Sequence, residues 1–254
     1  MRVSNSSNRL AENSSPKAYH WRERMLVLPH RQDGYAFLTG TGLEIGALHE
    51  PAAVPLRCTV EYFDVMDERK AAEAFPELAP EQFVFVDHIG DLDTGGLAQF
   101  TDGRFDFTII NHVLEHLANP VKTIQEVFRI TRTGGVVVLS IPDKEYTFDQ
   151  HRPLTSLEHL WADYEADTRM SSDDHYLEWL HSAAPEIFAQ GADAVKVHVQ
   201  RARDRREHAH VWNSDSFRAF LDASIARLGI EAELLFESRA ASNQIEYFSA
   251  WRKR

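Results

Sequence analysis

The stretch FDFTIINHVLEHLANPVKTIQEVFRITRTGGVVVLSIPD, residues 105–143, carries the pattern that decides the fold. It opens and closes on short apolar runs, at 105–110 and 135–141, which are typical of strands buried on both faces of a parallel sheet. Between them, residues 119–132 repeat apolar side chains at helical spacing, with Asn119 placed to cap the first turn. The stretch therefore predicts strand, helix and strand, which form one right-handed crossover unit.

The same alternation continues on both sides of this stretch. The other short apolar runs, each of strand length, lie at 42–46, 59–65, 83–88, 232–238 and 244–251. Strands alternating with helices predict an α/β fold: a Rossmann-like, doubly wound sheet of seven strands with helices on both faces. Residues 143–210 break the rhythm, with few β runs, many aromatic residues and seven of the 13 histidines. We expect a helical insertion there, before the last two strands, in the position of a substrate-binding lid.

Composition restricts the class of protein. The 254 residues carry a formal net charge of −12 and one cysteine, Cys58, so a disulfide scaffold and a multi-cysteine zinc site are excluded. The acidic balance argues against a nucleic-acid partner, and no run reaches the roughly 18 apolar residues of a membrane span. We expect a cytoplasmic protein with a partly disordered N-terminal extension at 1–40 and one domain at 41–254.

The first candidate site is the turn in LEIGALHEP, residues 43–51. Glu44 lies near the end of a predicted strand, and Gly46 begins the turn that follows it. Doubly wound sheets bind their ligands at this edge. A glycine there lets a ligand approach the backbone closely. Because the G-x-G-x-x-G pattern is absent, a pyrophosphate cradle and a nicotinamide cofactor are disfavoured.

Two acidic residues follow the next two predicted strands. Asp64 stands eighteen residues after Gly46, which is the placement of a carboxylate that binds ribose hydroxyls, although a helix N-cap is the alternative. Asp91 could accept a hydrogen bond from an adenine amino group, with Leu92 offering its backbone amide, or it could cap a helix at 93–100. The sequence leaves these alternatives open.

In order and spacing, these features and the segment NHVLEH (111–116) resemble a class I S-adenosylmethionine-dependent methyltransferase of the methyltransferase type 11 kind. The resemblance covers residues 42–143 and, by pattern, 213–252. One residue departs from it, because the family commonly has a second glycine where Leu48 stands. The turn LEIGALHEP and the segment PDKEYTFDQHRP resemble a bacterial subgroup associated with the O-methylation of sugars and polysaccharides.

The resemblance implies S-adenosylmethionine as the cofactor and assigns its contacts. The implied contacts are Glu44, Gly46 and Ala47 for the methionine part, Asp64 and Val65 for the ribose, Asp91 and Leu92 for the adenine, and Asn111 and His112 beside the transferable methyl. A cationic sulfonium suits the acidic stretch 61–106, which holds twelve Asp or Glu against three Lys or Arg. No residue spacing is a strong signature for Mg²⁺, so we assign no metal ligands.

Methyl transfer to an alcohol requires a base for the hydroxyl proton, and histidine titrates near neutral pH. The candidates are His112 and His116 in the NHVLEH segment and His151, His208 and His210 in and after the insertion. Asp149 could orient one of them, whereas a structural hydrogen bond is the alternative for each. A further alternative is a divalent metal held by His208, His210 and Asp149, since the two histidines face one way if the chain is extended.

The insertion also offers side chains suited to a polyhydroxylated acceptor. The substrate-binding candidates are Tyr146, Arg152, Trp161 and Tyr164, and packing of the insertion on the core is the alternative for the aromatic residues. The basic run at 201–206 (RARDRR) could bind an anionic substrate, although a solvated helix face or loop is the favoured interpretation.

The predicted function is an O-methyltransferase that acts on a saccharide or polysaccharide precursor by in-line displacement, with a histidine and an aspartate assisting as general base. Its partner is then a small-molecule or oligosaccharide acceptor. The alternatives are a small-metabolite O- or N-methyltransferase and a non-catalytic S-adenosylmethionine-binding module. A homodimer is left open.

Overall fold

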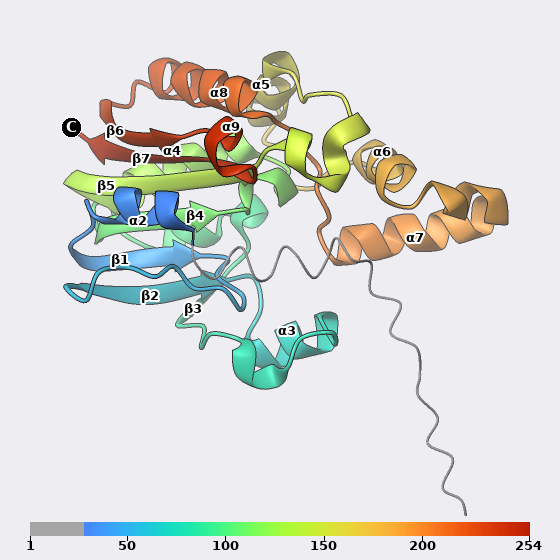
Figure 1. The fold of residues 1–254 in the computed structure, drawn as a ribbon, viewed down its shortest axis with the longest axis horizontal. Helices are drawn as coiled ribbons and strands as arrows, with labels where there is room; N and C mark the ends of the chain where they lie inside the picture. The colour runs from blue at the N-terminus through green and yellow to red at the C-terminus, as the bar shows by residue number, and fades with distance from the viewer. Residues whose placement is uncertain (1–27) are drawn as a thin grey trace, which may run out of the picture.

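The computed structural model describes residues 28–254, and they form one seven-stranded sheet in the order β3-β2-β1-β4-β5-β7-β6 (Figure 1). The strands are β1 (Gly40–Ile45), β2 (Cys58–Asp64), β3 (His88–Ile89), β4 (Phe105–Asn111), β5 (Thr131–Pro142), β6 (Ala232–Ser238) and β7 (Glu246–Lys253). Only β7 runs antiparallel to its neighbours, β5 and β6. The strand order reverses between β1 and β4, and ligands of such sheets bind at the carboxyl ends of the strands beside this point.

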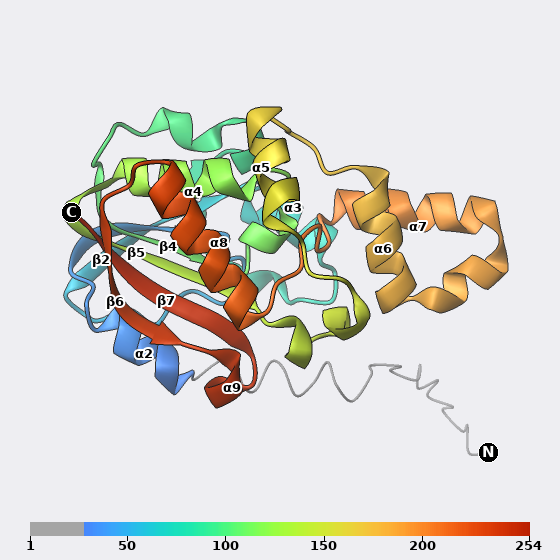
Figure 2. The same ribbon diagram turned by 90° about the horizontal axis from the view of Figure 1, so that it is seen from above.

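Helices cover both faces of the sheet (Figure 2), as the sequence predicts for a doubly wound fold. The helices are α2 (Pro29–Tyr35), α3 (Glu68–Ala74), α4 (Pro120–Ile130), α5 (Leu157–Glu165), α6 (Asp173–Ala183), α7 (Ala192–Asp204), α8 (Ser214–Arg227) and α9 (Ala240–Asn243). Helices α4, α5 and α8 share one buried cluster with Val137 and Leu139 of β5. On the opposite face, Tyr35 of α2 packs with Val136 and Val138 of the same strand. The alternation along β5 therefore divides the core into two layers.

Helix α4 forms where the apolar spacing predicts it. The side chain of Asn119 accepts a hydrogen bond from the backbone N–H of Lys122 at 3.0 Å, which caps the first turn. Val121, Ile124 and Val127 are fully buried. The helix ends at Ile130, two residues earlier than predicted, because β5 pairs with β4 from Thr131 onward.

The strand predicted at 83–88 is wrong, because only His88–Ile89 pairs with β2. The backbone N–H of Val84 donates to the carbonyl of Leu48 at 3.0 Å, so this segment crosses over the turn after β1. Phe85 is 70% exposed. An edge segment has no second neighbour to bury its apolar side chains, and the run therefore forms a loop.

The insertion is helical, as predicted, and projects from the carboxyl edge of the sheet (Figures 1 and 2). Helix α5 packs against α4 of the main body. Helices α6 and α7 share a small cluster of their own, which includes Tyr176, Leu180 and Val199. Among residues 28–254, no helix combines the length and apolar character needed to cross a membrane.

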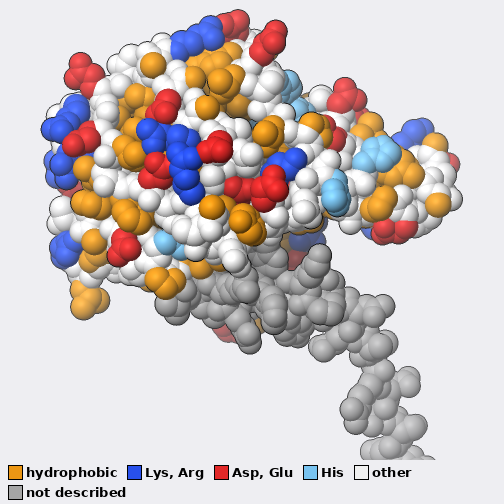
Figure 3. All heavy atoms as spheres, turned by 45° about the horizontal axis from the view of Figure 1, so that its top comes forward, with side chains coloured by type: hydrophobic (Ala, Val, Ile, Leu, Met, Phe, Trp, Pro, Cys, Tyr) orange, Lys and Arg blue, Asp and Glu red, His pale blue; other side chains and the backbone are white. Residues whose placement is uncertain are grey.

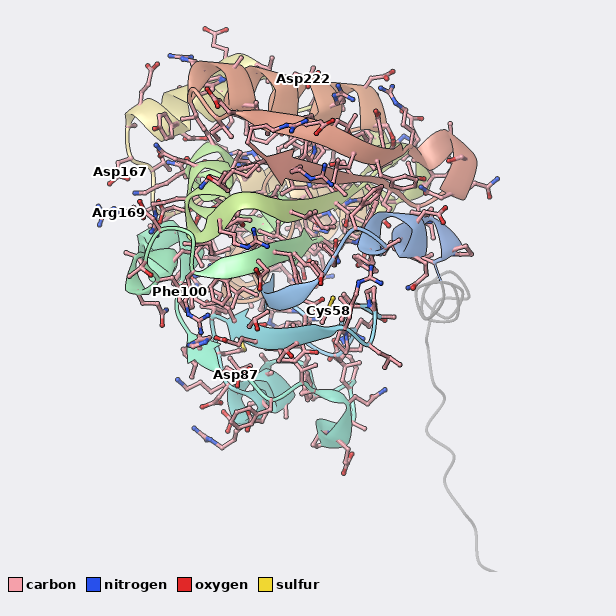
Figure 4. The ribbon with its side chains drawn as sticks, turned by 90° about the vertical axis from the view of Figure 1, so that its left-hand side faces the viewer. Cys58, Asp87, Phe100, Asp167, Arg169 and Asp222 are labelled. Atoms are coloured by element: carbon pink, nitrogen blue, oxygen red, sulfur yellow. The ribbon has the colours of Figure 1, made fainter. Side chains whose placement is uncertain are left out.

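Most of the predicted extension at 1–40 falls outside the described residues, which begin at residue 28. The prediction that part of it is disordered also concerns residues outside this range. The described part of the extension packs onto the sheet, with Tyr35 and Leu38 buried. Cys58 is a free thiol at the amino end of β2, opposite the ligand edge (Figure 4).

Candidate active site

The turn after β1 has a backbone shape that favours glycine at two positions. Gly46 has φ +72°, and a Cβ placed on it would lie 2.5 Å from Cγ2 of Val113. Leu48 has φ +47°, which is the left-handed region. The turn therefore keeps a glycine-like conformation at the position where Leu48 departs from the family pattern.

Glu44 lies beneath this turn and is 2% exposed. Its two carboxylate oxygens accept the backbone N–H of Ala52 at 2.9 and 3.0 Å, which closes the loop over the strand end. Burial raises the pKa of Glu44 to about 7, although the Ala52 bond and the Arg31 guanidinium act in the opposite direction. The carboxyl group of Glu44 therefore loses its proton more easily when a cation lies beside it.

Asp64 ends β2 and accepts the backbone N–H of Val65 at 2.6 Å. Burial raises the pKa of its carboxyl group. The N-cap of the following helix, α3, is Asp67, so the capping alternative for Asp64 is wrong. Its carboxylate therefore stays a candidate for the ribose hydroxyls.

Asp91 does act as a cap. It accepts the backbone N–H of Asp93 at 3.0 Å and begins the short 3₁₀ turn Leu92–Thr94, which replaces the predicted helix at 93–100 together with a second turn at Gly96–Gln99. Its carboxylate also binds the guanidinium of Arg206, with NH1 at 3.1 Å from Oδ1. An adenine contact from Asp91 stays a prediction.

Arg206 is a residue that sequence analysis missed at this site. It follows α7 and lies beside three acids of the main body. Arg206 pairs with Asp91, lies 3.6 Å from Asp93 and lowers the pKa of Asp64. Its neighbour Arg205 pairs with Glu77 at 2.9 Å. The interpretation as a solvated surface is therefore wrong for Arg206, which docks the insertion onto the main body, whereas Arg205 is exposed.

Asn111 and His112 end β4, next to the turn after β1. Asn111 donates to the hydroxyl of Tyr35 at 2.9 Å and accepts from Ser140 at 3.0 Å, so its amide is held on both sides. His112 has φ +52°, and its Nε2 lies 2.7 Å from Oε2 of Glu246. The imidazole is thus oriented by a carboxylate.

Glu246 is fully buried at the start of β7 and was not predicted as a site residue. Arg31 binds both of its oxygens, at 2.7 and 2.6 Å, and His30 lies 2.7 Å from Oε1. Burial alone raises the pKa of Glu246, but Arg31 and the hydrogen bonds lower it well below its ordinary value. A separation of 215 residues between Arg31 and Glu246 left no local signal for this pair.

A second histidine–carboxylate pair lies in the insertion. Nδ1 of His208 is 2.5 Å from Oδ2 of Asp149, which also accepts from Arg152 at 2.8 Å. Burial lowers the pKa of His208, but Asp149 outweighs it and the net shift is upward. Asp149 therefore orients His208, whereas His151 is exposed at the end of the 3₁₀ turn Phe148–His151.

His210 has a different environment from His208. It is 1% exposed and its ring lies among those of His159 and His175, at centroid distances of 5.6 and 5.2 Å. Burial, with a contribution from His175, lowers the pKa of His210 well below its ordinary value. The predicted alternative of one metal held by His208, His210 and Asp149 is therefore wrong, because the two histidines belong to separate clusters.

Three of the four predicted substrate-binding residues have structural partners. The side chain of Arg152 is 1% exposed and binds Asp149, Glu178 and two backbone carbonyls. Trp161 is buried in the core, and Tyr164 packs against it and hydrogen-bonds Gln125. Tyr146 is 39% exposed and stays available to a ligand.

A doubly wound sheet with acids at the ligand edge and no phosphate-binding glycine loop is the arrangement of class I S-adenosylmethionine-dependent methyltransferases. A family model described as a methyltransferase domain matches residues 18–224. The chain belongs to this methyltransferase domain family, whose class uses S-adenosylmethionine as its cofactor.

The individual relatives match only a short part of this chain. A methyltransferase of uncharacterised specificity from Mycolicibacterium gilvum is 34% identical over 76 residues, which are 30% of this chain and 29% of that protein. The chain spans less than a third of the length of the curated relatives it matches.

Two solved structures are similar to this chain at low identity. One, from Rhodobacter sphaeroides and described as Zn-dependent alcohol dehydrogenases, has a TM-score of 0.50, is 17% identical, and covers 95% of this chain and 100% of its own. Another, a possible histamine N-methyltransferase from Thermotoga maritima, has a TM-score of 0.49, is 15% identical, and covers 94% and 95%.

The residues present fit S-adenosylmethionine. The backbone turns sharply at the strand end through left-handed conformations at Gly46 and Leu48, and a Cβ at Gly46 would collide with Val113. Asp64 offers a carboxylate one strand away, at the distance along the chain that suits a ribose. Glu44 adds a buried acid below the turn, which suits a positively charged ligand.

Proposed function

We propose that this methyltransferase transfers a methyl group to a hydroxyl of a saccharide or polysaccharide precursor. The observation that carries the proposal is the pair formed by His112 and Glu246 at the end of β4, with 2.7 Å between Nε2 and Oε2. An alcohol becomes a competent nucleophile only when a base removes its proton as the new bond forms. A histidine oriented by a buried carboxylate is suited to that task.

The surroundings of Glu246 favour this role for His112. Because Arg31 keeps the pKa of Glu246 low, the carboxylate stays charged and holds the imidazole of His112 in one orientation. Nε2 of His112 faces Glu246, which leaves Nδ1 to accept the proton of the acceptor hydroxyl. Bound S-adenosylmethionine supplies a methyl group that is already activated, so the protein mainly orients the acceptor and excludes water.

Exposed aromatic residues near the second histidine support a sugar-like acceptor. Tyr146 and Phe148 are 39% and 48% exposed, directly after β5, and the ring of Phe148 lies 4.9 Å from that of His208. Aromatic faces pack well on the C–H faces of sugar rings. On the face shown in Figure 3, many Lys and Arg side chains lie beside Asp and Glu.

The test is turnover with mono- and oligosaccharide acceptors, followed by release of S-adenosylhomocysteine. His112→Gln should lower kcat by about 10²–10⁴-fold and leave the affinity for S-adenosylhomocysteine unchanged, since only the proton acceptor is removed. His88→Gln is the matched control, because His88 also pairs with a carboxylate, Glu61, at 2.7 Å but lies on the edge strand β3. Turnover with amines and with no hydroxyl acceptor would favour a small-metabolite N-methyltransferase instead.

A further inference from the structure

A second constellation lies directly after β4, outside the His112–Glu246 pair. Glu115 and His116 belong to the 3₁₀ turn Leu114–His116, and His208 lies in the segment after α7. One potential ligand atom from each of these three residues lies within 4.8 Å of the other two. The rings of His116 and His208 stand edge to face, with centroids 4.8 Å apart.

Glu115 is the member whose environment calls for a cation. It is 2% exposed, and neither of its carboxylate oxygens has a hydrogen-bond partner among the described residues. Burial raises the pKa of this carboxyl group. A buried carboxylate without donors is costly, and such groups are normally paired or bound to a metal ion.

The two histidines are held in the orientation that metal ligands require. Nδ1 of His116 lies 2.5 Å from the carbonyl oxygen of Arg206, and Nδ1 of His208 lies 2.5 Å from Asp149. Each ring therefore uses Nδ1 as a donor to an outer oxygen and keeps Nε2 free for an ion. This carbonyl–histidine or carboxylate–histidine arrangement is the usual outer shell of a protein metal site.

The backbone also fixes the three residues relative to one another. The carbonyl of Glu115 accepts the N–H groups of Ala209 and His210, at 2.8 and 3.0 Å, which ties the His208 segment to the turn after β4. Arg152 holds Asp149 at 2.8 Å and binds the carbonyl of His208 at 2.9 Å. The constellation is thus braced from both sides without any contribution from a bound ion.

We propose that Glu115, His116 and His208 bind one divalent transition-metal ion, such as Zn²⁺ or Mn²⁺. Two imidazoles and one carboxylate suit these ions, whereas Mg²⁺ and Ca²⁺ prefer ligand sets made of oxygen. Three protein ligands leave at least one coordination position open. If the proposed O-methylation is correct, the ion would lower the pKa of an acceptor hydroxyl bound at this open position.

A three-histidine cluster of His159, His175 and His210 is the competing location for an ion. It has weaker support, because Nε2 of His159 already lies 3.1 Å from Asp163 and the side chain of His159 is 41% exposed. Nδ1 of His175 lies 3.0 Å from the carbonyl of Ala209, which is the same outer arrangement as at His116, but this cluster contains no buried carboxylate that needs a counter-charge. His159→Gln therefore serves as the matched control in the test of the proposed site.

The test is metal binding to the full chain after EDTA treatment, with Zn²⁺ measured by titration calorimetry and elemental analysis and Co²⁺ by its absorption spectrum. The unmodified protein should bind one equivalent. Glu115→Gln and His208→Gln should weaken binding by more than about 100-fold, and Asp149→Asn by about 10–100-fold. His159→Gln should bind as the unmodified protein does.

Binding of S-adenosylhomocysteine and the thermal midpoint establish that each variant is folded. Glu115→Gln removes only a buried carboxylate without hydrogen-bond partners, so it keeps the test decisive if the His208 and Asp149 variants fold poorly. Absence of stoichiometric binding, its survival in all three site variants, or its loss only in His159→Gln would overturn the site. These readings need no acceptor, so they are independent of the proposed function. If the ion binds but EDTA leaves saccharide turnover unchanged, the site stands and its role in activating the acceptor is refuted.

Discussion

Replacing Glu246 with glutamine should destabilise the protein strongly. Glu246 is fully buried and receives two bonds from Arg31, at 2.7 and 2.6 Å, with His30 and His112 each at 2.7 Å. Glu246→Gln keeps the volume but leaves the buried guanidinium of Arg31 without a counter-charge. Removing one partner of a buried ion pair costs about 3–5 kcal/mol. At about 2–4 °C per kcal/mol for a protein of this size, the thermal midpoint should fall by about 6–20 °C.

The assay is thermal unfolding followed by circular dichroism, with Glu233→Gln as the control. Glu233 lies in β6 and pairs with Arg252 and Arg254, but its side chain is 42% exposed. The same chemical change there should cost less than about 1 kcal/mol. If Glu246→Gln lowers the midpoint no more than Glu233→Gln does, the argument that the buried charge of Glu246 holds Arg31 is refuted. A double variant, Arg31→Met with Glu246→Leu, should recover part of the loss because no buried charge is left unpaired.

Three further outcomes test the cofactor site. Because burial raises the folded-state pKa of Glu44 to about 7, the folded protein keeps a proton that the unfolded chain releases from about pH 4.5 upward. The stability that this group contributes is therefore lost as pH rises from about 4.5 to 7, on the order of 3 kcal/mol. Glu44→Gln should consequently raise the thermal midpoint more at pH 8 than at pH 5. An equal effect at both pH values would contradict this reasoning. Leu48→Gly should change the affinity for S-adenosylhomocysteine by less than about threefold, since the backbone is already left-handed, whereas Leu48→Val should weaken it; a gain above tenfold in the glycine variant would show that the leucine obstructs the site. Asp64→Ala should weaken binding by about 1.5–3 kcal/mol in calorimetry, and Asp67→Ala, which removes only a helix cap, should not; unchanged affinity in Asp64→Ala would reject the ribose contact.

Local patterns predicted the elements whose side chains are buried by their immediate neighbours. Helix α4 follows from its apolar spacing and the cap at Asn119, and Val121, Ile124 and Val127 are buried as that spacing predicts. The run at 83–88 has the same apolar character as the true strands but forms a loop, because it lies at the sheet edge. Apolar composition therefore predicts a buried strand only where the sheet continues on both sides.

The acids of the cofactor site could be proposed from spacing along the chain, since each follows a strand and parallel strands end at one edge. Arg206, the cation beside these acids, could not be proposed from spacing. Arg206 reaches Asp91 only because α7 returns to the main body, and the pair is separated by 115 residues. The sequence also could not show that two of the candidate bases have different environments. The fold pairs His208 with Asp149 and buries His210 in another cluster.

By itself, the sequence determined that this chain forms a doubly wound sheet with a methyltransferase motif order, since strand, helix and turn signals depend on residues close together along the chain. Only the tertiary structure decided which charges meet. Glu246 with Arg31 and His112, and Glu115 and His116 with His208, join residues from distant segments. The partners of a buried polar group are set by how the elements pack, and packing brings together side chains that no local pattern relates.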